Sequence, residues 1–190
     1  MVMRLYLDGC SLTYGHGLPR EQSLGHLFSE IGGYEVLDKS APGKSNMSIA
    51  FDTYQNRKDF DVFVLGFTYS ERFGIKRQGQ DLKFFPGFRT DSFGLEPQNL
   101  DLAHLEVQKY FFTVFEEPYS SQLSDMLIDS TVNLLASNKC LVLPFTWQPR
   151  NTEAYLHNFY FGPFDRLPDG HLNAQGTRKL FDNLQSLLDV

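Results

Sequence analysis

A serine near the start of the chain and a histidine near its end are the residues best suited to act together in catalysis. Ser11 lies in the run Gly-Cys-Ser-Leu-Thr-Tyr-Gly at residues 9–15, where the flanking glycines allow a sharp turn and a close approach by a substrate. A serine hydroxyl is a weak nucleophile until a base removes its proton. The run Pro-Asp-Gly-His at residues 168–171 supplies such a base in His171 and an orienting carboxylate in Asp169. These residue types predict nucleophilic catalysis by a serine hydroxyl.

Neighbouring residues offer alternatives to this assignment. A serine beside glycine, an Asp-Gly pair or a lone histidine is most often structural by itself, so the prediction depends on their joint placement. Cys10 is an alternative nucleophile, but adjacent residues of a strand point to opposite faces, and a thiol in an apolar run is most often buried. His16 follows the Ser11 turn and either lines the same site or lies in a solvated loop.

The apolar pattern predicts the elements that must position these residues. Short apolar runs predict strands at residues 4–9, 34–37, 61–67 and 140–145. Apolar residues spaced by three and four predict helices at residues 19–31, 45–57, 99–115, 121–137 and 173–188, with Ser45 or Asn46 capping the second. Strands that alternate with helices imply the three-layer α/β class, a doubly wound parallel sheet covered on both faces. Chemistry then gathers at the carboxyl ends of the strands, where residues 9–15, 40–46, 66–72 and 145–150 lie.

Three of the helices have a predicted buried face. In helix 19–31 this face carries Leu24, Leu27, Phe28 and Ile31. In helix 121–137 it carries Leu123, Met126, Leu127, Leu134 and Leu135, and in helix 173–188 it carries Leu180, Phe181, Leu184, Leu187 and Leu188.

One domain is expected to span all 190 residues, because no linker or repeat divides the chain. Residues 71–97 interrupt the rhythm with glycines, prolines and phenylalanines that include Phe84, Phe85, Phe88 and Phe93, which predicts an irregular insertion that includes a candidate hairpin. The phenylalanines of this insertion either stack on sugar rings beside Ser11 or pack the insertion against the helices. Both readings stay open at this point.

Composition excludes several classes of function. The formal charge of −6 and the lack of any Lys/Arg run argue against nucleic-acid binding. The five histidines and two cysteines show no metal-ligand spacing, and two cysteines make no disulfide framework, so neither metal nor cofactor is expected. The run Gly-Lys-Ser at residues 43–45 mimics the end of a phosphate-binding loop, but Asp38 stands where the earlier glycine belongs. With no signal-peptide pattern and no membrane-spanning run, a cytoplasmic location is expected, and a phage or virion setting stays open.

Three runs of residues resemble the motif blocks of the SGNH (GDSL-type) hydrolases. Residues 9–15 resemble the first block, Gly-Asp-Ser-Leu-Thr-x-Gly, and the run Ser-Ala-Pro-Gly-Lys-Ser-Asn at 40–46 resembles the second. Asp169 and His171 resemble the last block, which precedes the final helix. This resemblance implies a flavodoxin-like SGNH fold in which Ser11 is the nucleophile, His171 is the general base and Asp169 orients the imidazole. It also implies that the oxyanion is bound by the backbone N–H groups of Ser11 and Gly43.

The sequence departs from the family pattern at three places. Cys10 replaces the aspartate that usually precedes the nucleophile. In the third block, usually Gly-x-Asn-Asp, Thr68 replaces the asparagine whose side chain completes the oxyanion hole, and Ser70 or Arg72 are substitutes for it. The last block has the spacing Asp-x-His in place of Asp-x-x-His, a form also found in acetyl-transferring and acetyl-hydrolysing branches, and Asp165 is the fallback partner for the histidine.

The resulting hypothesis is a serine esterase that removes a small acyl group, most plausibly acetyl, from a carbohydrate-like or other small ester. Arg72, Trp147, Arg150 and His16 are the candidate substrate contacts around the site, and Arg72 can also clamp an anionic group. Two alternatives remain, a non-catalytic carbohydrate-binding module on the same scaffold and an O-acyltransferase. The oligomeric state is left open.

Overall fold

A computed structural model describes residues 2–70, 72–77, 80–84, 119–147 and 150–188. Its strands are β1 (Arg4–Gly9), β2 (Glu35–Asp38), β3 (Val62–Phe67), β4 (Phe73–Arg77), β5 (Gln80–Phe84), β6 (Leu141–Thr146) and β7 (His157–Asn158). Its α-helices are α1 (Ser11–Tyr14), α2 (Leu24–Glu30), α3 (Asn46–Asn56), α5 (Tyr119–Ser137) and α6 (Ala174–Leu188), and its 3₁₀ helices are η1 (Arg20–Gln22) and η4 (Pro163–Asp165).

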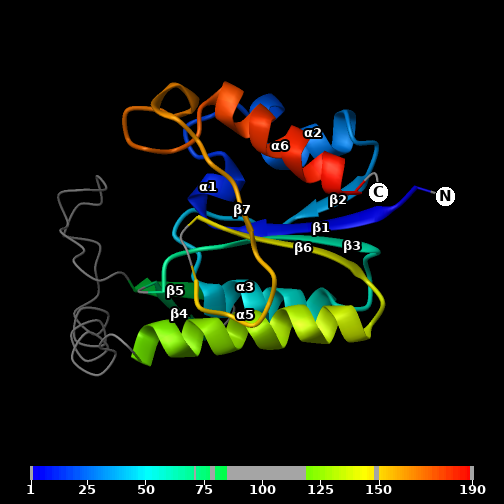
Figure 1. The fold of residues 1–190 in the computed structure, drawn as a ribbon, viewed down its shortest axis with the longest axis vertical. Helices are drawn as coiled ribbons and strands as arrows, with labels where there is room; N and C mark the ends of the chain where they lie inside the picture. Colours follow the sequence, from blue (N-terminus) through cyan, green and yellow to red (C-terminus); the bar gives the residue numbers. More distant parts are fainter. Residues whose placement is uncertain (1, 71, 78–79, 85–118, 148–149, 189–190) are drawn as a thin grey trace.

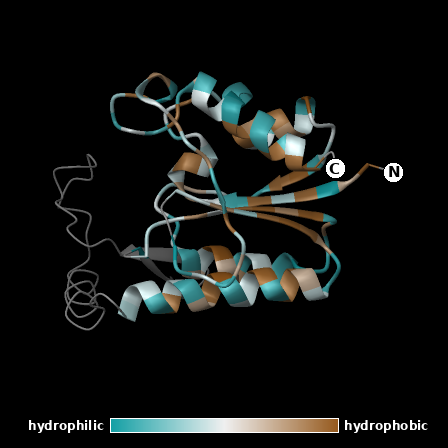
Figure 2. Cartoon of the chain, viewed as in Figure 1, coloured by the Kyte–Doolittle hydropathy of each residue, from teal (hydrophilic) through white to brown (hydrophobic). Residues whose placement is uncertain are grey.

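Five strands form a parallel sheet in the order β2-β1-β3-β6-β7, with α2 and α6 on one face and α3 and α5 on the other (Figure 1). Two apolar clusters fill the two interfaces, and the strands feed them alternately. Leu5, Leu7, Val62 and Val64 point toward α2 and α6, whereas Tyr6, Phe63, Leu65 and Phe67 point toward α3 and α5. Figure 2 shows the apolar residues concentrated on these central strands, as a sheet covered on both faces requires.

The first predicted helix is shorter than expected. The chain forms η1 and then has an extended backbone at Ser23, the N-cap of α2. The Ser23 side chain accepts the N–H of His26 at 3.3 Å, so α2 begins only at Leu24. Leu24, Leu27 and Phe28 are buried as expected. Ile31 is exposed, because it is the C-cap of α2 and lies beyond the face that meets the sheet.

The predicted buried face of α5 is confirmed at Leu135 and wrong at Met126. The helix buries Ser124, Ile128, Thr131 and Leu135, and Met126 is 65% exposed. These four residues are spaced by four, three and four positions, so they lie on one face of the helix. The hydroxyl of Ser124 accepts a hydrogen bond from Asn46, and that of Thr131 donates to the Leu127 carbonyl. Hydropathy alone favoured the leucines of the neighbouring face. The predicted buried residues of α6 are confirmed at Leu180, Phe181 and Leu184.

The predicted hairpin is confirmed, since β4 and β5 pair in antiparallel fashion and pack beside α3. The rest of the insertion, at residues 85–97, and the helix expected at 99–115 lie outside the described residues. The short strand β7 was not predicted, and it extends the sheet by pairing with the end of β6. Among the described residues, none of the helices combines the length and the apolar character that crossing a membrane requires.

Candidate active site

Ser11 lies at the carboxyl end of β1, at the first position of the short helix α1. Cys10 before it is extended (φ −88°, ψ −164°), so the chain changes from strand to helix between these two residues. Two glycines make room for this change, because a Cβ added at Gly9 or at Gly66 on the neighbouring strand would collide with the buried Thr13 side chain. The close packing of α1 against β1 and β3 therefore depends on glycine at both positions.

The Cys10 side chain lies in the apolar cluster between the sheet and the helices α2 and α6, with no exposed surface. A reactive thiolate needs an accessible and electropositive setting. The burial of Cys10 therefore argues against the alternative in which this thiol is the nucleophile. Cys140, the second free cysteine, is partly buried just before β6.

His171 lies against Ser11, with its Nε2 atom 3.0 Å from the Ser11 Oγ. The two residues are 160 positions apart in sequence. The histidine belongs to a tight loop before α6, in which the N–H of Leu167 donates to the His171 carbonyl at 2.7 Å and Gly170 adopts a left-handed conformation (φ +87°). The glycine meets that φ without strain, so the loop can hold the imidazole at hydrogen-bonding distance from the serine.

Asp169 lies on the other side of the imidazole ring. Its Oδ2 atom is 3.1 Å from His171 Nδ1, but the ring N–H is not aimed at this oxygen closely enough for a hydrogen bond. Its Oδ1 atom accepts the backbone N–H of His171 at 3.1 Å, which is the main reason that the pKa of Asp169 lies below its ordinary value. The carboxylate is 54% exposed, so Asp169 can orient the histidine only in competition with water.

Asp165, the fallback partner for the histidine, points elsewhere. Its buried carboxylate accepts the N–H of Gly162 at 2.9 Å and lies 3.1 Å from the Nζ of Lys179. The Lys179 ammonium lowers the pKa of Asp165. The backbone carbonyl of Asp165 accepts the N–H of Asn173 at 2.9 Å. Asp165 therefore supports the loop that carries His171 through its backbone, while its carboxylate contacts Lys179 and Gly162.

The two segments expected to bind an oxyanion reach the same edge of the sheet. Gly43 has a left-handed conformation (φ +72°) in a turn closed by the Lys44 N–H and the Ala41 carbonyl at 3.2 Å. The N–H of Ser11 belongs to the first turn of α1, where a helix leaves its N–H groups without intrahelical acceptors. Thr68 lies two residues beyond Gly66, which pairs with Gly9, so the segment after β3 leaves the sheet at the same edge as the segment that carries Ser11.

Asn46, at the start of α3, holds the Thr68 segment in place. Its side-chain oxygen accepts the Thr68 N–H at 2.7 Å, and its amide group donates to the Thr68 carbonyl at 2.9 Å and to the hydroxyl of Ser124 at 2.6 Å. All three residues are buried. The sequence was interpreted only for the capping role of Asn46, and that role belongs to Ser45, which accepts the N–H of Ser48 at 3.2 Å.

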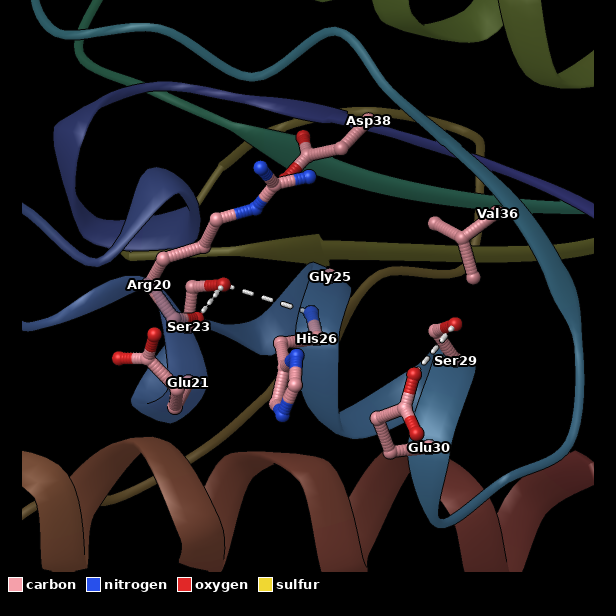
Figure 3. Close-up of a pocket in the computed structure, with 9 residues that line it drawn as sticks. All are labelled: Arg20, Glu21, Ser23, Gly25, His26, Ser29, Glu30, Val36 and Asp38. Atoms are coloured by element: carbon pink, nitrogen blue, oxygen red, sulfur yellow. Dashed lines mark hydrogen bonds between the residues drawn. The ribbon is translucent and has the colours of Figure 1, made fainter.

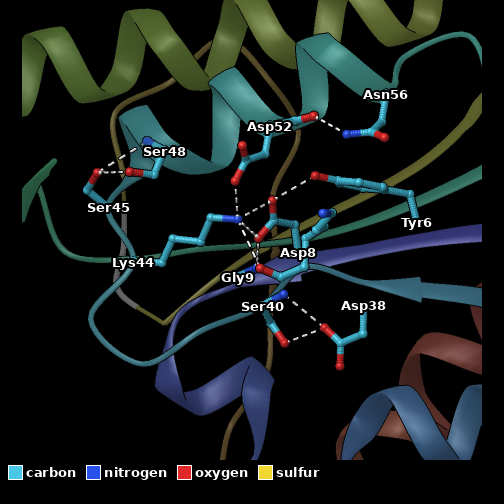
Figure 4. A network of polar contacts seen from close by, with 11 residues as sticks. Tyr6, Asp8, Gly9, Asp38, Ser40, Lys44, Ser45, Ser48, Asp52 and Asn56 are labelled. Carbon is cyan, nitrogen blue, oxygen red and sulfur yellow. Dashed lines mark hydrogen bonds and ion pairs between the residues drawn. The ribbon is translucent and has the colours of Figure 1, made fainter. Parts of the chain in front are cut away.

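A buried charged cluster around Lys44 lies at the carboxyl end of β1, where it includes Asp8 (Figure 4). The Nζ of Lys44 is 2.6 and 2.7 Å from the two carboxylate oxygens of Asp8 and 2.8 Å from Asp52 on α3. The hydroxyl of Tyr6 donates to Asp8 at 2.9 Å. Burial raises the pKa of Asp8 to about 7 against the opposing pull of Lys44 and Tyr6, and burial also raises the pKa of Tyr6. The sequence analysis missed this cluster, although an aspartate inside an otherwise apolar strand signals a buried partner.

Two of the four candidate substrate contacts lie beside His171 or beside Thr68. The exposed ring of His16 lies 4.8 Å from the His171 ring, measured between centroids. The guanidinium of Arg72 donates to the Thr68 hydroxyl at 3.0 Å and lies 5.0 Å above the ring of Tyr69.

The other two candidates pack into the protein. The ring of Trp147 lies edge-on to Phe145 at 5.3 Å and beside Phe161 at 5.9 Å, as part of the apolar layer around the core. Arg150 lies 2.8 Å from Asp125 of α5, and only 4% of its side chain is exposed. The expectation that Arg150 contacts substrate at a rim is therefore wrong, because a buried ion pair occupies its guanidinium.

A separate polar pocket of about 480 Å³ lies between η1, α2 and the edge strand β2 (Figure 3). Charged side chains line it, including Arg20, Glu21, Glu30 and Asp38, and none of the residues around Ser11 takes part. Burial raises the pKa of Asp38. Within the described ranges, no three His, Cys, Asp or Glu side chains, those of this pocket included, are placed so that they could hold a metal ion together.

Comparison with known proteins finds a likeness in structure. No protein-family model and no curated protein matches the sequence. The psychrotrophic esterase EstA from Pseudoalteromonas sp., in a structure inhibited by monoethylphosphonate, overlays with a TM-score of 0.53 at 11% identity, over 98% of this chain and 99% of the esterase. TesA overlays with a TM-score of 0.44 at 12% identity over 97% of both chains. A protein from Desulfitobacterium hafniense DCB-2, assigned to the G-D-S-L family of lipolytic proteins, overlays with a TM-score of 0.38 at 14% identity, over 98% of this chain and 71% of that protein. The overlay with EstA confirms the expected fold class.

Proposed function

We propose, taking the SGNH-hydrolase fold of this chain as the premise, that the protein is a carboxylic ester hydrolase with Ser11 as its nucleophile. The observation that carries this proposal is the 3.0 Å contact between the Ser11 Oγ and the His171 Nε2. A nucleophile and a base within hydrogen-bonding distance are the first geometric requirement of acyl transfer through a serine.

In the proposed reaction, His171 takes the hydroxyl proton while the Ser11 Oγ forms a bond to the acyl carbon. The carbonyl oxygen becomes an oxyanion, which the N–H groups of Ser11 and Gly43 bind. The imidazolium then gives its proton to the leaving alcohol as the ester bond breaks, which leaves an acyl-serine. A water molecule repeats the sequence, with His171 again as base, and releases the acid. Asp169 stabilises the imidazolium in both halves.

The third donor to the oxyanion is proposed to be the hydroxyl of Thr68. This oxygen already accepts a hydrogen bond from Arg72, so its own proton is available for another acceptor. Arg72 thereby polarises the threonine hydroxyl and makes it a better donor than an isolated one. A threonine held in this way can replace the asparagine that the third motif block usually carries.

The proposed substrate is an acetyl or similarly short ester of a carbohydrate-like alcohol. The Asp-x-His spacing supports a small acyl group by resemblance. Three rings on the segment that leads to His171, those of Tyr155, Tyr160 and Phe164, are each more than three-quarters exposed. Exposed aromatic faces of this kind can stack on sugar rings, and they leave apolar surface in water if nothing covers them.

The test is hydrolysis of p-nitrophenyl acetate by the wild type, Ser11→Ala and His171→Ala. Matched controls are Ser29→Ala and His26→Ala, which change the same residue types at the remote polar pocket. We expect turnover in the wild type and both controls, and none above background in the two site variants. A fluorophosphonate should phosphonylate Ser11, with loss of fluoride, only when His171 is present. Turnover that survives Ser11→Ala would refute Ser11 as the nucleophile. A wild type that does not exceed background would refute the proposed function and favour the binding module.

Substrate class needs a second assay. Rates with acetyl, butyryl and octanoyl p-nitrophenyl esters, and acetate release from acetylated monosaccharides, measure the preferred acyl and alcohol groups. A steep fall in kcat/KM beyond acetyl would support the short-acyl proposal, and a rise with chain length would refute it. A new sugar ester formed when a free sugar is added would identify an O-acyltransferase.

A further inference from the structure

The side chain of Lys44 connects two segments that the proposed reaction must keep in register. Lys44 follows Gly43, but its side chain turns inward and is only 2% exposed (Figure 4). At its end, the ammonium group meets both oxygens of Asp8 at the end of β1, Asp52 on α3 at 2.8 Å, and the carbonyl of Lys39 at 3.0 Å. One cation therefore links strand β1, helix α3 and both ends of the segment 39–44.

Each end of the Lys44–Asp8 pair lies next to a proposed oxyanion donor. On one side, Gly43 is the residue before Lys44. On the other, Asp8 accepts the N–H of Gly9 at 2.7 Å, at the point where the chain turns toward Ser11. The ion pair thus spans the gap between the two strand ends whose N–H groups must converge on one oxygen.

The segment around Gly43 is tied to β1 through its backbone, because the N–H of Ala41 donates to the Gly9 carbonyl at 3.1 Å. Its turn is closed by the bond from the Lys44 N–H to the Ala41 carbonyl, at 3.2 Å, and Gly43 itself adopts a left-handed conformation (φ +72°). Glycine has more conformational freedom than any other residue, so such a turn moves easily unless a neighbour fixes it. The Lys44 side chain adds a strong restraint just after Gly43, because moving its ammonium away would leave the buried carboxylates of Asp8 and Asp52 without a compensating charge.

We propose that Lys44, anchored by Asp8 and Asp52, is a positioning residue that holds the Gly43 N–H in register with Ser11 for oxyanion binding. The inference rests on the proposed function and adds to it a residue that touches no substrate. An oxyanion donor must be placed before the reaction, since its value comes from needing no reorganisation as charge develops. The expected consequence of losing Lys44 is a lower kcat with little change in KM.

The experiment separates positioning from folding by means of charge balance. Lys44→Met leaves two buried carboxylates uncompensated and is expected to destabilise the protein. The double variant Lys44→Met/Asp8→Asn removes one carboxylate as well, and the asparagine oxygen can still accept the Gly9 N–H. We expect the double variant to regain stability but to keep a kcat about 10²- to 10³-fold below the wild type, the loss typical of one oxyanion donor. KM should stay within about twofold, because the ester is still bound before charge develops. Lys58→Met, on the exposed surface, is the matched control.

The outcomes are distinguishable. If the double variant regains both stability and a wild-type kcat while turnover still depends on Ser11, Lys44 is only structural and this inference falls. If KM rises while kcat stays at the wild-type value, the side chain contributes to substrate binding and the positioning role is likewise refuted. If wild type and Ser11→Ala do not differ, the proposed function fails, and this inference fails with it.

Discussion

Replacing Asp169 by asparagine tests how much the third member of the proposed triad contributes. The asparagine oxygen can still accept the backbone N–H of His171, which now bonds to Asp169 at 3.1 Å, so the loop should keep its shape. What is lost is the negative charge 3.1 Å from the Nδ1 of His171. The variant therefore tests two effects of the carboxylate together, its stabilisation of the imidazolium that forms when Ser11 gives up its proton and its choice of the His171 tautomer.

The geometry predicts a moderate effect. Losing the aspartate of a buried, well-aligned triad lowers kcat by about 10⁴. In this protein the carboxylate is half exposed, and the ring N–H is not aimed at it. The attraction between two charges is about fourfold weaker in bulk water than near a protein surface. Full exposure of the carboxylate would therefore reduce the loss of kcat from about 10⁴-fold toward about 10-fold. Because the carboxylate is only half exposed, we expect Asp169→Asn to lower kcat by about 10- to 100-fold.

The assay is p-nitrophenyl acetate turnover across pH, with circular dichroism to verify folding. Asp165→Asn is the matched control, because that carboxylate lies on the same loop but contacts Lys179 and not the ring. It should lower the melting temperature with little change in kcat. A 10⁴-fold loss in Asp169→Asn would show that the loop closes into an aligned triad with substrate. A loss below twofold would show that another group orients His171, and either result would refute this reasoning.

Three further predictions concern the scaffold behind the site. Burial raises the pKa of Asp8 from 3.8 to about 7, so the stability that this residue contributes is fully present below pH 3.8 and is lost as pH rises through 7. The unfolding free energy measured in urea should therefore fall over this pH range in the wild type but not in Asp8→Asn. An equal fall in both proteins would contradict the prediction. Gly66→Ala would place a Cβ 2.7 Å from the Phe145 ring and should cost about 1–3 kcal/mol in unfolding free energy, whereas Gly162→Ala, with its nearest atom at 3.9 Å, should cost little. Asn46→Ala removes three buried hydrogen bonds at about 1 kcal/mol each and should lower both urea stability and kcat; a change in neither would show that the segment after β3 holds itself.

Hydrophobic periodicity predicted most of the described fold, because burial on two faces of a sheet imposes a pattern that the sequence must carry. The strand at 61–67 appears as β3, buried along its whole length, and the helix at 45–57 appears as α3. Periodicity failed on α5, where Ser124 and Thr131 face inward although Met126 is more apolar. A polar residue can be buried when it has a hydrogen-bond partner inside the protein. The partner of Ser124 is Asn46, which lies 78 positions away in the sequence.

The site shows the same division. Residue types and strand ends were enough to select Ser11 and His171 as candidates. They were not enough to assign a partner to each charged side chain, so Arg150 was expected at a rim and lies instead against Asp125. Long side chains reach across elements, and their partners are decided by which elements become neighbours.

By itself, the sequence determined the α/β class, the order of its elements and the residues able to act as nucleophile and base, since these depend on local pattern and residue chemistry. Only the tertiary structure decided that the Ser11 hydroxyl lies 3.0 Å from the His171 imidazole and that Lys44 turns inward to Asp8. Both contacts join residues far apart in the chain, and their distances follow from how closely α1, β1 and the loops pack. The notch between Gly9 and Gly66, which admits Thr13, is the physical reason that this packing is so tight.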